Sequence, residues 1–173
     1  MNANFEERMA KIKAHAVAEE NKKRSIAEAE ERHHEELKES IKAMAPRIAN
    51  LLDLANACVK NGVEPYKAES GVTVGSTTNR LEADGFFHWL GFNCYFNHTM
   101  RSKEEITELA IINGGACGNT DLRVGRNGIA KGYIEKSYYH DGGYTEPRTR
   151  DMEKFLKQFD EFEEMVLNFV DNL

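Results

Sequence analysis

The stretch LRVGRNGIAKGYIEKSYY, residues 122–139, decides the fold class of this 173-residue chain. Two segments rich in apolar and aromatic residues, Leu122–Arg126 and Ile129–Tyr139, flank the pair Asn127 and Gly128. Both central residues of a type I′ turn need a positive φ angle, which asparagine and glycine adopt readily. The stretch therefore predicts a β-hairpin with a two-residue type I′ connection.

The regions before and after the hairpin differ in composition and in the spacing of their apolar residues. Glycine, threonine and aromatic residues before it predict further strands at Val72–Val74, Phe86–Phe96 and Ile106–Asn113. For the third of these, a short helix that begins at Glu104-Glu105 and runs through Leu109 is the alternative. After the hairpin, apolar residues recur with helical spacing and predict an amphipathic helix over residues 151–172. Its apolar stripe consists of Phe155, Leu156, Phe159, Phe162, Val166, Phe169 and Val170.

The first 45 residues predict a long helix. Alanine, glutamate, lysine and arginine dominate them, and glycine and proline are absent from Asn4 to Ala45. Pro46 suits the first turn of a second helix, which ends at Asn61-Gly62. The expected apolar face of that second helix is Ile48, Leu51, Leu52, Ala55, Cys58 and Val59.

The long helix has an interrupted apolar seam. Phe5, Met9, Ile12 and Ala16 follow a 4-3-4 spacing, and the seam resumes at Leu37. Charged or polar residues occupy the seam between them, namely Glu19, Lys23, Glu30 and His33. A solvated helix with salt bridges and a self-associating coiled coil are both consistent with this pattern.

These segments together predict an α+β fold. It has a long N-terminal helix, a second helix, a small antiparallel β-sheet with a protruding hairpin, and a C-terminal amphipathic helix packed on the sheet. Residues 1–45 form the long helix, for self-association or partner contact. Residues 46–173 form the body, which includes the hairpin over 121–139 and the helix over 151–172.

Composition restricts the cellular setting and the chemistry. No apolar run approaches the length of about 18 residues that a membrane helix needs, and no apolar segment follows the N-terminus. Three cysteines are an odd number without disulfide-framework spacing, so we expect reduced thiols in the cytoplasm. Cys94 and His98 lack the second close pair that structural zinc sites use, so we expect no metal and no cofactor.

A thiol enzyme is a weaker alternative. Cys117 lies in a glycine-rich segment, and His140-Asp141 follows the predicted hairpin, so a nucleophile and a base are available. The same glycines are explained by a turn between strands. We therefore favour a protein without catalytic activity over a thiol enzyme or a zinc-binding module.

The charge pattern points to nucleic acid. Residues 114–150 carry six basic and four acidic groups, whereas residues 151–173 carry two basic and seven acidic groups. Basic groups bind phosphates, and exposed aromatic rings stack on unpaired bases. The predicted nucleic-acid-binding residues of the hairpin are Arg123, Arg126, Lys131, Tyr133, Lys136, Tyr138 and Tyr139.

The charged N-terminal helix, the compact body and the basic hairpin around Arg126-Asn127-Gly128-Ile129 resemble the layout of some small anti-CRISPR proteins of mobile elements. The resemblance covers most of the chain but assigns no role to any residue. It implies an inhibitor that acts on the Cas9–guide RNA assembly, by blocking it or by affecting its guide. The expected function is therefore binding of RNA or of a ribonucleoprotein, and the alternative is a homodimeric coiled-coil adaptor.

Overall fold

The computed structural model describes residues 3–63, 66–67, 85–89, 92–96, 105–111, 120–134 and 141–173. The chain divides into two compact units, Met1–Glu36 and Leu37–Leu173. The second unit holds the sheet, its core and the candidate site.

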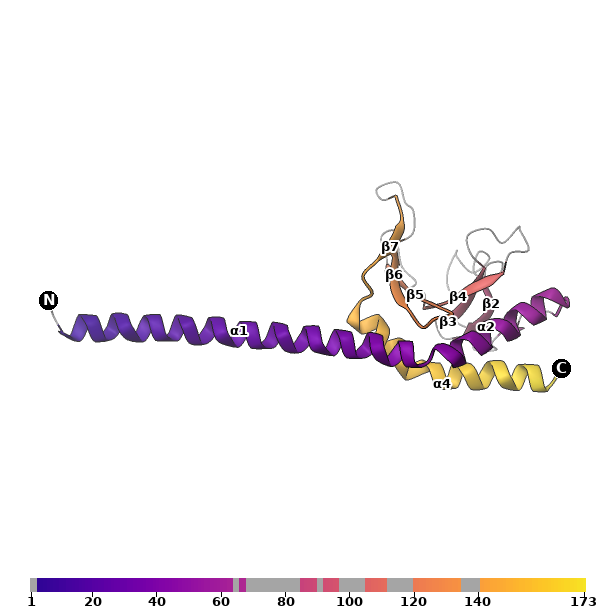
Figure 1. The fold of residues 1–173 in the computed structure, drawn as a ribbon, viewed down its shortest axis with the longest axis horizontal. Helices are drawn as coiled ribbons and strands as arrows, with labels where there is room; N and C mark the ends of the chain where they lie inside the picture. Colours follow the sequence, from indigo (N-terminus) through magenta and orange to yellow (C-terminus); the bar gives the residue numbers. More distant parts are fainter. Residues whose placement is uncertain are drawn as a thin grey trace. The chain divides into compact units, whose positions relative to one another are not determined.

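Three helices lie within the described residues, as the sequence predicted (Figure 1): α1 (Ala3–Ala43), α2 (Ala45–Lys60) and α4 (Thr149–Asp171). Pro46 lies in the first turn of α2, where its missing N–H group has no partner to lose. The last helix starts at Thr149, the earlier of the two starting residues that the sequence allows, Thr149 and Asp151. Arg148 precedes it in an extended conformation and makes no side-chain capping bond.

The described strands form one sheet whose spatial order follows the sequence, β1-β2-β3-β4-β5-β6-β7. All neighbours pair antiparallel except β1 and β2, which pair parallel. The α+β class is confirmed. The strands are β1 (Tyr66–Lys67), β2 (Gly85–Trp89), β3 (Phe92–Phe96), β4 (Ile106–Ile111), β5 (Thr120–Gly125), β6 (Ala130–Ile134) and β7 (Gly143–Thr145).

The single strand expected over Phe86–Phe96 is wrong. β2 and β3 are separate strands that pair antiparallel, with Trp89 opposite Phe92. The continuous run of aromatic and apolar residues hid the reversal, because only Gly91 in the connection is a turn-forming residue. The strand expected at Val72–Val74 lies outside the described residues, and the short strand β7 was not predicted.

The hairpin of β5 and β6 is confirmed, but its connection differs from the type I′ prediction. The Gly128 N–H donates to the Gly125 carbonyl oxygen at 2.8 Å, and the Gly125 N–H donates to the Ile129 carbonyl oxygen at 3.2 Å. Gly128 has a φ angle of +73°. This pattern is a three-residue connection in which a four-residue turn is followed by a glycine in a bulge position.

The turn end of the hairpin packs against α1 instead of protruding. Gly128 is buried, and a Cβ atom added to it would lie 2.8 Å from Lys42 Cα and 3.0 Å from the Ile41 carbonyl oxygen. Both strands of the hairpin also have neighbours, since β4 pairs with β5 and β7 pairs with β6. The hairpin is therefore part of the interior of the sheet.

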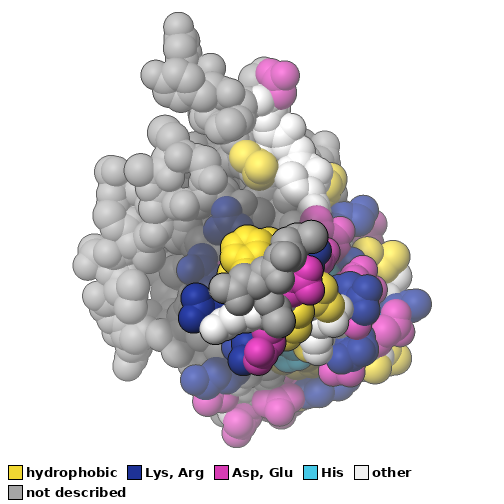
Figure 2. Space-filling model, turned by 90° about the vertical axis from the view of Figure 1, so that its left-hand side faces the viewer, with side chains coloured by type: hydrophobic (Ala, Val, Ile, Leu, Met, Phe, Trp, Pro, Cys, Tyr) yellow, Lys and Arg dark blue, Asp and Glu magenta, His cyan; other side chains and the backbone are white. Residues whose placement is uncertain are grey.

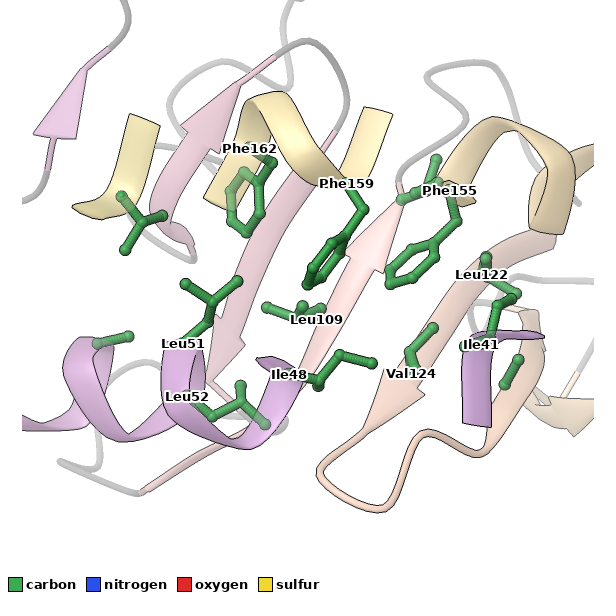
Figure 3. Close-up of a cluster of buried hydrophobic side chains, with 14 of the residues drawn as sticks. Ile41, Ile48, Leu51, Leu52, Leu109, Leu122, Val124, Phe155, Phe159 and Phe162 are labelled. Atoms are coloured by element: carbon green, nitrogen blue, oxygen red, sulfur yellow. The ribbon is translucent and has the colours of Figure 1, made fainter. Parts of the chain in front are cut away.

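The core lies between one face of the sheet and the helices α2 and α4 (Figure 3). The predicted stripes of both helices are buried there, apart from Val59, whose side chain is not described, and three residues of α4 that are only partly buried. Leu37 and Ile41 of α1 join this core, so the body begins before the expected boundary at residue 46. The labelled core residues in Figure 3 are Ile41, Ile48, Leu51, Leu52, Leu109, Leu122, Val124, Phe155, Phe159 and Phe162.

Two polar contacts hold α2 against its neighbours. Arg47 binds Asp160 at 2.6 Å and also pairs with Glu163, both on α4, and its guanidinium lies 4.8 Å from the centre of the Phe159 ring. The Asn56 side chain accepts from the Ile106 N–H at 2.7 Å and donates to the Ile106 carbonyl oxygen at 2.9 Å. Asn56 thus supplies both hydrogen bonds that a neighbouring strand would give to the first residue of β4.

We predict that Gly128→Ala destabilises the body more than Gly62→Ala. Both glycines have similar positive φ angles, +73° and +70°, so both substitutions cost about 1–2 kcal/mol in backbone strain. Only Gly128 also faces backbone atoms, of Ile41 and Lys42, which adds about 1–3 kcal/mol of overpacking. Urea unfolding measures the difference, and equal free energies of unfolding for the two variants would contradict the close packing.

We predict that Asn56→Ala lowers the free energy of unfolding by about 1–3 kcal/mol, because it leaves two polar groups of Ile106 without their partner. Asn61→Ala is the matched control. The Asn61 side chain makes one exposed hydrogen bond to the Ala57 carbonyl oxygen, at 2.7 Å, one helical turn earlier in the chain. Its loss should change stability by less than about 0.5 kcal/mol. Thermal unfolding of both variants checks the prediction.

Candidate functional site

Several of the predicted site residues lie on the face of β4–β7 that is turned away from α2 and α4, the outer face. Leu122 and Val124 are buried in the core, so Arg123 between them points to the outer face. The sheet register pairs Arg123 with Lys131 and Tyr133 with Tyr144. Polar and aromatic side chains from four strands therefore meet on the outer face, namely Glu108, Arg123, Lys131, Tyr133 and Tyr144.

Arg123 is buried beneath the outer face, against Tyr133 and Glu108. Its side chain is only 5% exposed, and its guanidinium lies 3.7 Å from the centre of the Tyr133 ring. Its Nη1 atom lies 3.8 Å from Oε2 of Glu108. A buried charge is tolerated only where opposite charge and polar contacts compensate it. Arg123 thus positions Tyr133 and balances Glu108, and its contact with nucleic acid stays a prediction.

Tyr144 is the exposed aromatic residue of the outer face, with 47% of its surface accessible. Its hydroxyl group donates a hydrogen bond to Oε1 of Glu108 at 2.9 Å. Its ring meets the ring of Tyr133 edge-on at 5.5 Å between centres, and the Lys131 ammonium lies 4.9 Å from its centre. Partial burial, together with the hydrogen bond to Glu108, raises the pKa of Tyr144 to about 12.

Arg126 lies at the turn of the hairpin and forms an ion pair with Asp53 on α2. The hydrogen bond to Asp53 raises the pKa of Arg126. Arg126 and Lys131 contribute to the rim of an open hollow of about 430 Å³ beside the hairpin turn. The other residues that line the hollow are Thr107, Glu108, Gly125, Asn127 and Ile129.

The structure brings together three of the seven predicted site residues, Arg123, Lys131 and Tyr133, on the outer face. Arg126 lies at the turn, and Lys136, Tyr138 and Tyr139 lie outside the described residues. The site prediction omitted Tyr144, although its place among the basic residues after the hairpin was a usable signal.

Glu108 and Asp53 gave no signal in the sequence. They come from β4 and α2, far from the hairpin along the chain, and reach it only through tertiary packing. The cysteine and histidine side chains considered for zinc or thiol chemistry, Cys94, His98, Cys117 and His140, are not among those described. The outer face is the place at which described residues of the predicted site meet.

No protein family model matches this chain, and no curated protein or solved structure shows significant similarity to it. Among the described helices, none has a long enough apolar stretch to cross a membrane.

We predict that stability falls between about pH 10 and pH 12 partly through Tyr144. Unfolded tyrosine ionises near pH 10, whereas folded Tyr144 holds its proton to about pH 12. In that interval the unfolded state loses a proton that the folded state keeps, so rising pH favours unfolding. Tyr144→Phe should be less stable than the native chain at neutral pH, because it lacks the bond to Glu108, and should lose less stability above pH 10.

Urea unfolding across this pH range, with tyrosinate absorbance as a second probe, measures the effect. Glu108→Gln removes the negative charge while keeping an oxygen that accepts a hydrogen bond, so it should shift the Tyr144 titration to lower pH. Identical alkaline profiles for the native chain and Tyr144→Phe would show that Tyr144 does not hold its proton in this way.

Proposed function

We propose that this chain is a non-enzymatic cytoplasmic binding protein that contacts single-stranded RNA, alone or within a ribonucleoprotein, through the outer face. The observation that carries the proposal is the exposed Tyr144 ring, fixed by Glu108 and Tyr133 and adjacent to Lys131. The cytoplasmic setting is carried over from the cysteine pattern of the sequence, an odd number without disulfide-framework spacing.

Stacking is the first element of the proposed contact. An aromatic ring on the open face of an antiparallel sheet offers a platform for an unpaired base. Tyr144 is held at its hydroxyl group by Glu108 and at its edge by Tyr133. Little side-chain freedom is then lost when a base stacks on the ring, which favours binding.

Phosphate contact is the second element. Lys131 is exposed and lies over the Tyr144 ring, so a stacking base displaces its ammonium group towards the neighbouring phosphate. Arg126 lines the same hollow as Lys131. Arg126 is already paired with Asp53, so Lys131 is the one phosphate contact counted here. One such contact corresponds to a slope of about −0.7 for the logarithm of the binding constant against the logarithm of the salt concentration.

The arginines near the outer face have acidic partners, and this pairing reduces their electrostatic contribution to RNA affinity. Arg123 faces Glu108, and Arg126 pairs with Asp53. Viewed from the side of the N-terminus, the surface of the described residues likewise shows acidic and basic side chains intermixed (Figure 2). Affinity should therefore depend more on stacking at Tyr144 than on net charge, and it should be modest for RNA alone.

A ribonucleoprotein partner follows from the layout resemblance to small anti-CRISPR proteins. In this form of the proposal the outer face contacts RNA that is already presented by a protein, such as guide RNA on Cas9. The protein would then act as an inhibitor of that assembly, and partner contacts beyond the outer face would supply the remaining affinity.

We predict that Tyr144→Leu weakens binding to a fluorescently labelled single-stranded RNA of mixed sequence by about 5-fold to 150-fold, the range typical of one stacked base. Tyr144→Phe should retain most of the affinity because it keeps the ring. Lys131→Ala should reduce the salt slope by about 0.7. Fluorescence anisotropy over a series of salt concentrations measures all three effects.

Lys157→Ala is the matched control, since Lys157 is an exposed lysine on α4. Equal RNA affinity for the native chain, Tyr144→Leu and Lys131→Ala would exclude the outer face as the RNA site. A cleavage assay with guide-loaded Cas9 tests the inhibitor form separately. Unchanged cleavage together with intact RNA binding would reject inhibition of Cas9 and keep the RNA contact.

A further inference from the structure

The first unit of the chain exposes large apolar side chains along α1. Phe5 is 60% exposed, Met9 40%, Ile12 63% and Ile26 50%. Single exposed apolar residues are common on protein surfaces, but a contiguous row of them marks an interaction surface. The spacing of these residues along the helix shows whether they are scattered or form a contiguous row.

Four apolar residues form one continuous seam. Phe5, Met9, Ile12 and Ala16 are separated by four, three and four residues, which is the spacing of core positions in paired helices. Ile26 follows Ile12 by two heptads and belongs to the same seam. The seam is charged in between, at Glu19 and Lys23, so its continuous apolar part ends at Ala16.

This part of α1 lacks the packing that normally stabilises a helix. Every described side chain from Asn4 to His33 is exposed. Ion pairs one turn apart, such as Glu7–Lys11 at 2.8 Å and Arg24–Glu28 at 3.6 Å, stabilise a helix only slightly. Helices in water gain most of their stability by covering an apolar face. A second helix on the seam would supply that cover.

Charges beside the seam disfavour a parallel pair of identical helices. In a parallel pair each core residue faces its own copy, so Glu19 would meet Glu19 and Lys23 would meet Lys23. Beside the apolar part, Arg8 would lie next to Lys13 of the other helix. These like-charge contacts are unfavourable, and they recur on both sides of the pair because of its symmetry.

An antiparallel pair centred between Met9 and Ile12 removes these conflicts. Phe5 then faces Ala16 of the second copy, which sets a large side chain against a small one, and Met9 faces Ile12. Glu6 lies beside Lys13 of the second copy, and symmetry repeats this attractive contact. On the other flank of the pair, Arg8 lies beside His15 of the second copy. Glu19 and Lys23 lie beyond the four apolar layers, so neither meets its own copy.

We propose that the apolar seam of α1, residues 5–16, is a self-association surface on which two copies of this chain pair antiparallel. In the four core layers Phe5 packs on Ala16 and Met9 packs on Ile12, and symmetry repeats both contacts. The pairing is short, so the dimer forms and dissociates with protein concentration. It is independent of the RNA contact, because it uses residues of the first unit only.

Sedimentation equilibrium of the full chain over a wide concentration range tests the proposal. The native chain should pass from monomer to dimer, and Ile12→Glu should raise the dissociation constant by about tenfold or more, because it places a carboxylate against Met9. Val17→Glu is the matched control, since Val17 is 56% exposed on the same helix but lies beside the seam. It should leave the dissociation constant nearly unchanged.

Lys13→Glu distinguishes the two orientations. In the antiparallel pair the introduced carboxylate lies against Glu6 of the second copy and weakens the dimer several-fold, and Glu6→Lys added to it restores the affinity. In a parallel pair the substitution would relieve the repulsion with Arg8 and strengthen the dimer instead. A stronger dimer, a native chain that is monomeric at every concentration, or equal effects of Ile12→Glu and Val17→Glu would overturn the proposal.

Discussion

The apolar layer between the sheet and the helices α2 and α4 determines the direction of the side chains that form the site. Leu122 and Val124 must face this layer, and successive residues of a strand point to opposite sides. Arg123 is therefore directed to the outer face, where it is buried beneath Tyr133. Its charge then requires compensation, which Glu108 of the neighbouring strand supplies. The outer face is in this sense a consequence of the core.

The same packing changes the character of the hairpin. Its sequence is that of a free basic loop, but Gly128 lies against the backbone of α1 and Arg126 pairs with Asp53 of α2. Two of its basic side chains, Arg123 and Arg126, are thereby engaged with acidic partners. What remains accessible is an aromatic ring with one lysine beside it, so the surface favours stacking over a purely electrostatic contact.

The apolar seam of α1 is buried near one end of the helix and exposed near the other. Leu37 continues the heptad pattern that begins at Phe5, and it is buried in the core of the body together with Ile41. From Phe5 to Ala16 the same pattern is exposed. A helix whose seam is buried at Leu37 and exposed from Phe5 to Ala16 is suited to joining a folded body to a second chain.

The sequence by itself determined the helices, the β5–β6 hairpin and the apolar faces of α2 and α4, because each depends on residues within one or two turns or strands. It also named Arg123, Lys131 and Tyr133 as site residues. The predicted two-residue turn would have set Arg123 and Lys131 on opposite faces, and the observed three-residue connection pairs them on one face. Only the tertiary structure decided that Glu108 meets both Arg123 and Tyr144, since the chain segments concerned are brought together by burial of the core. Local periodicity reports which face of an element is apolar, but neighbours across a sheet are fixed by long-range packing.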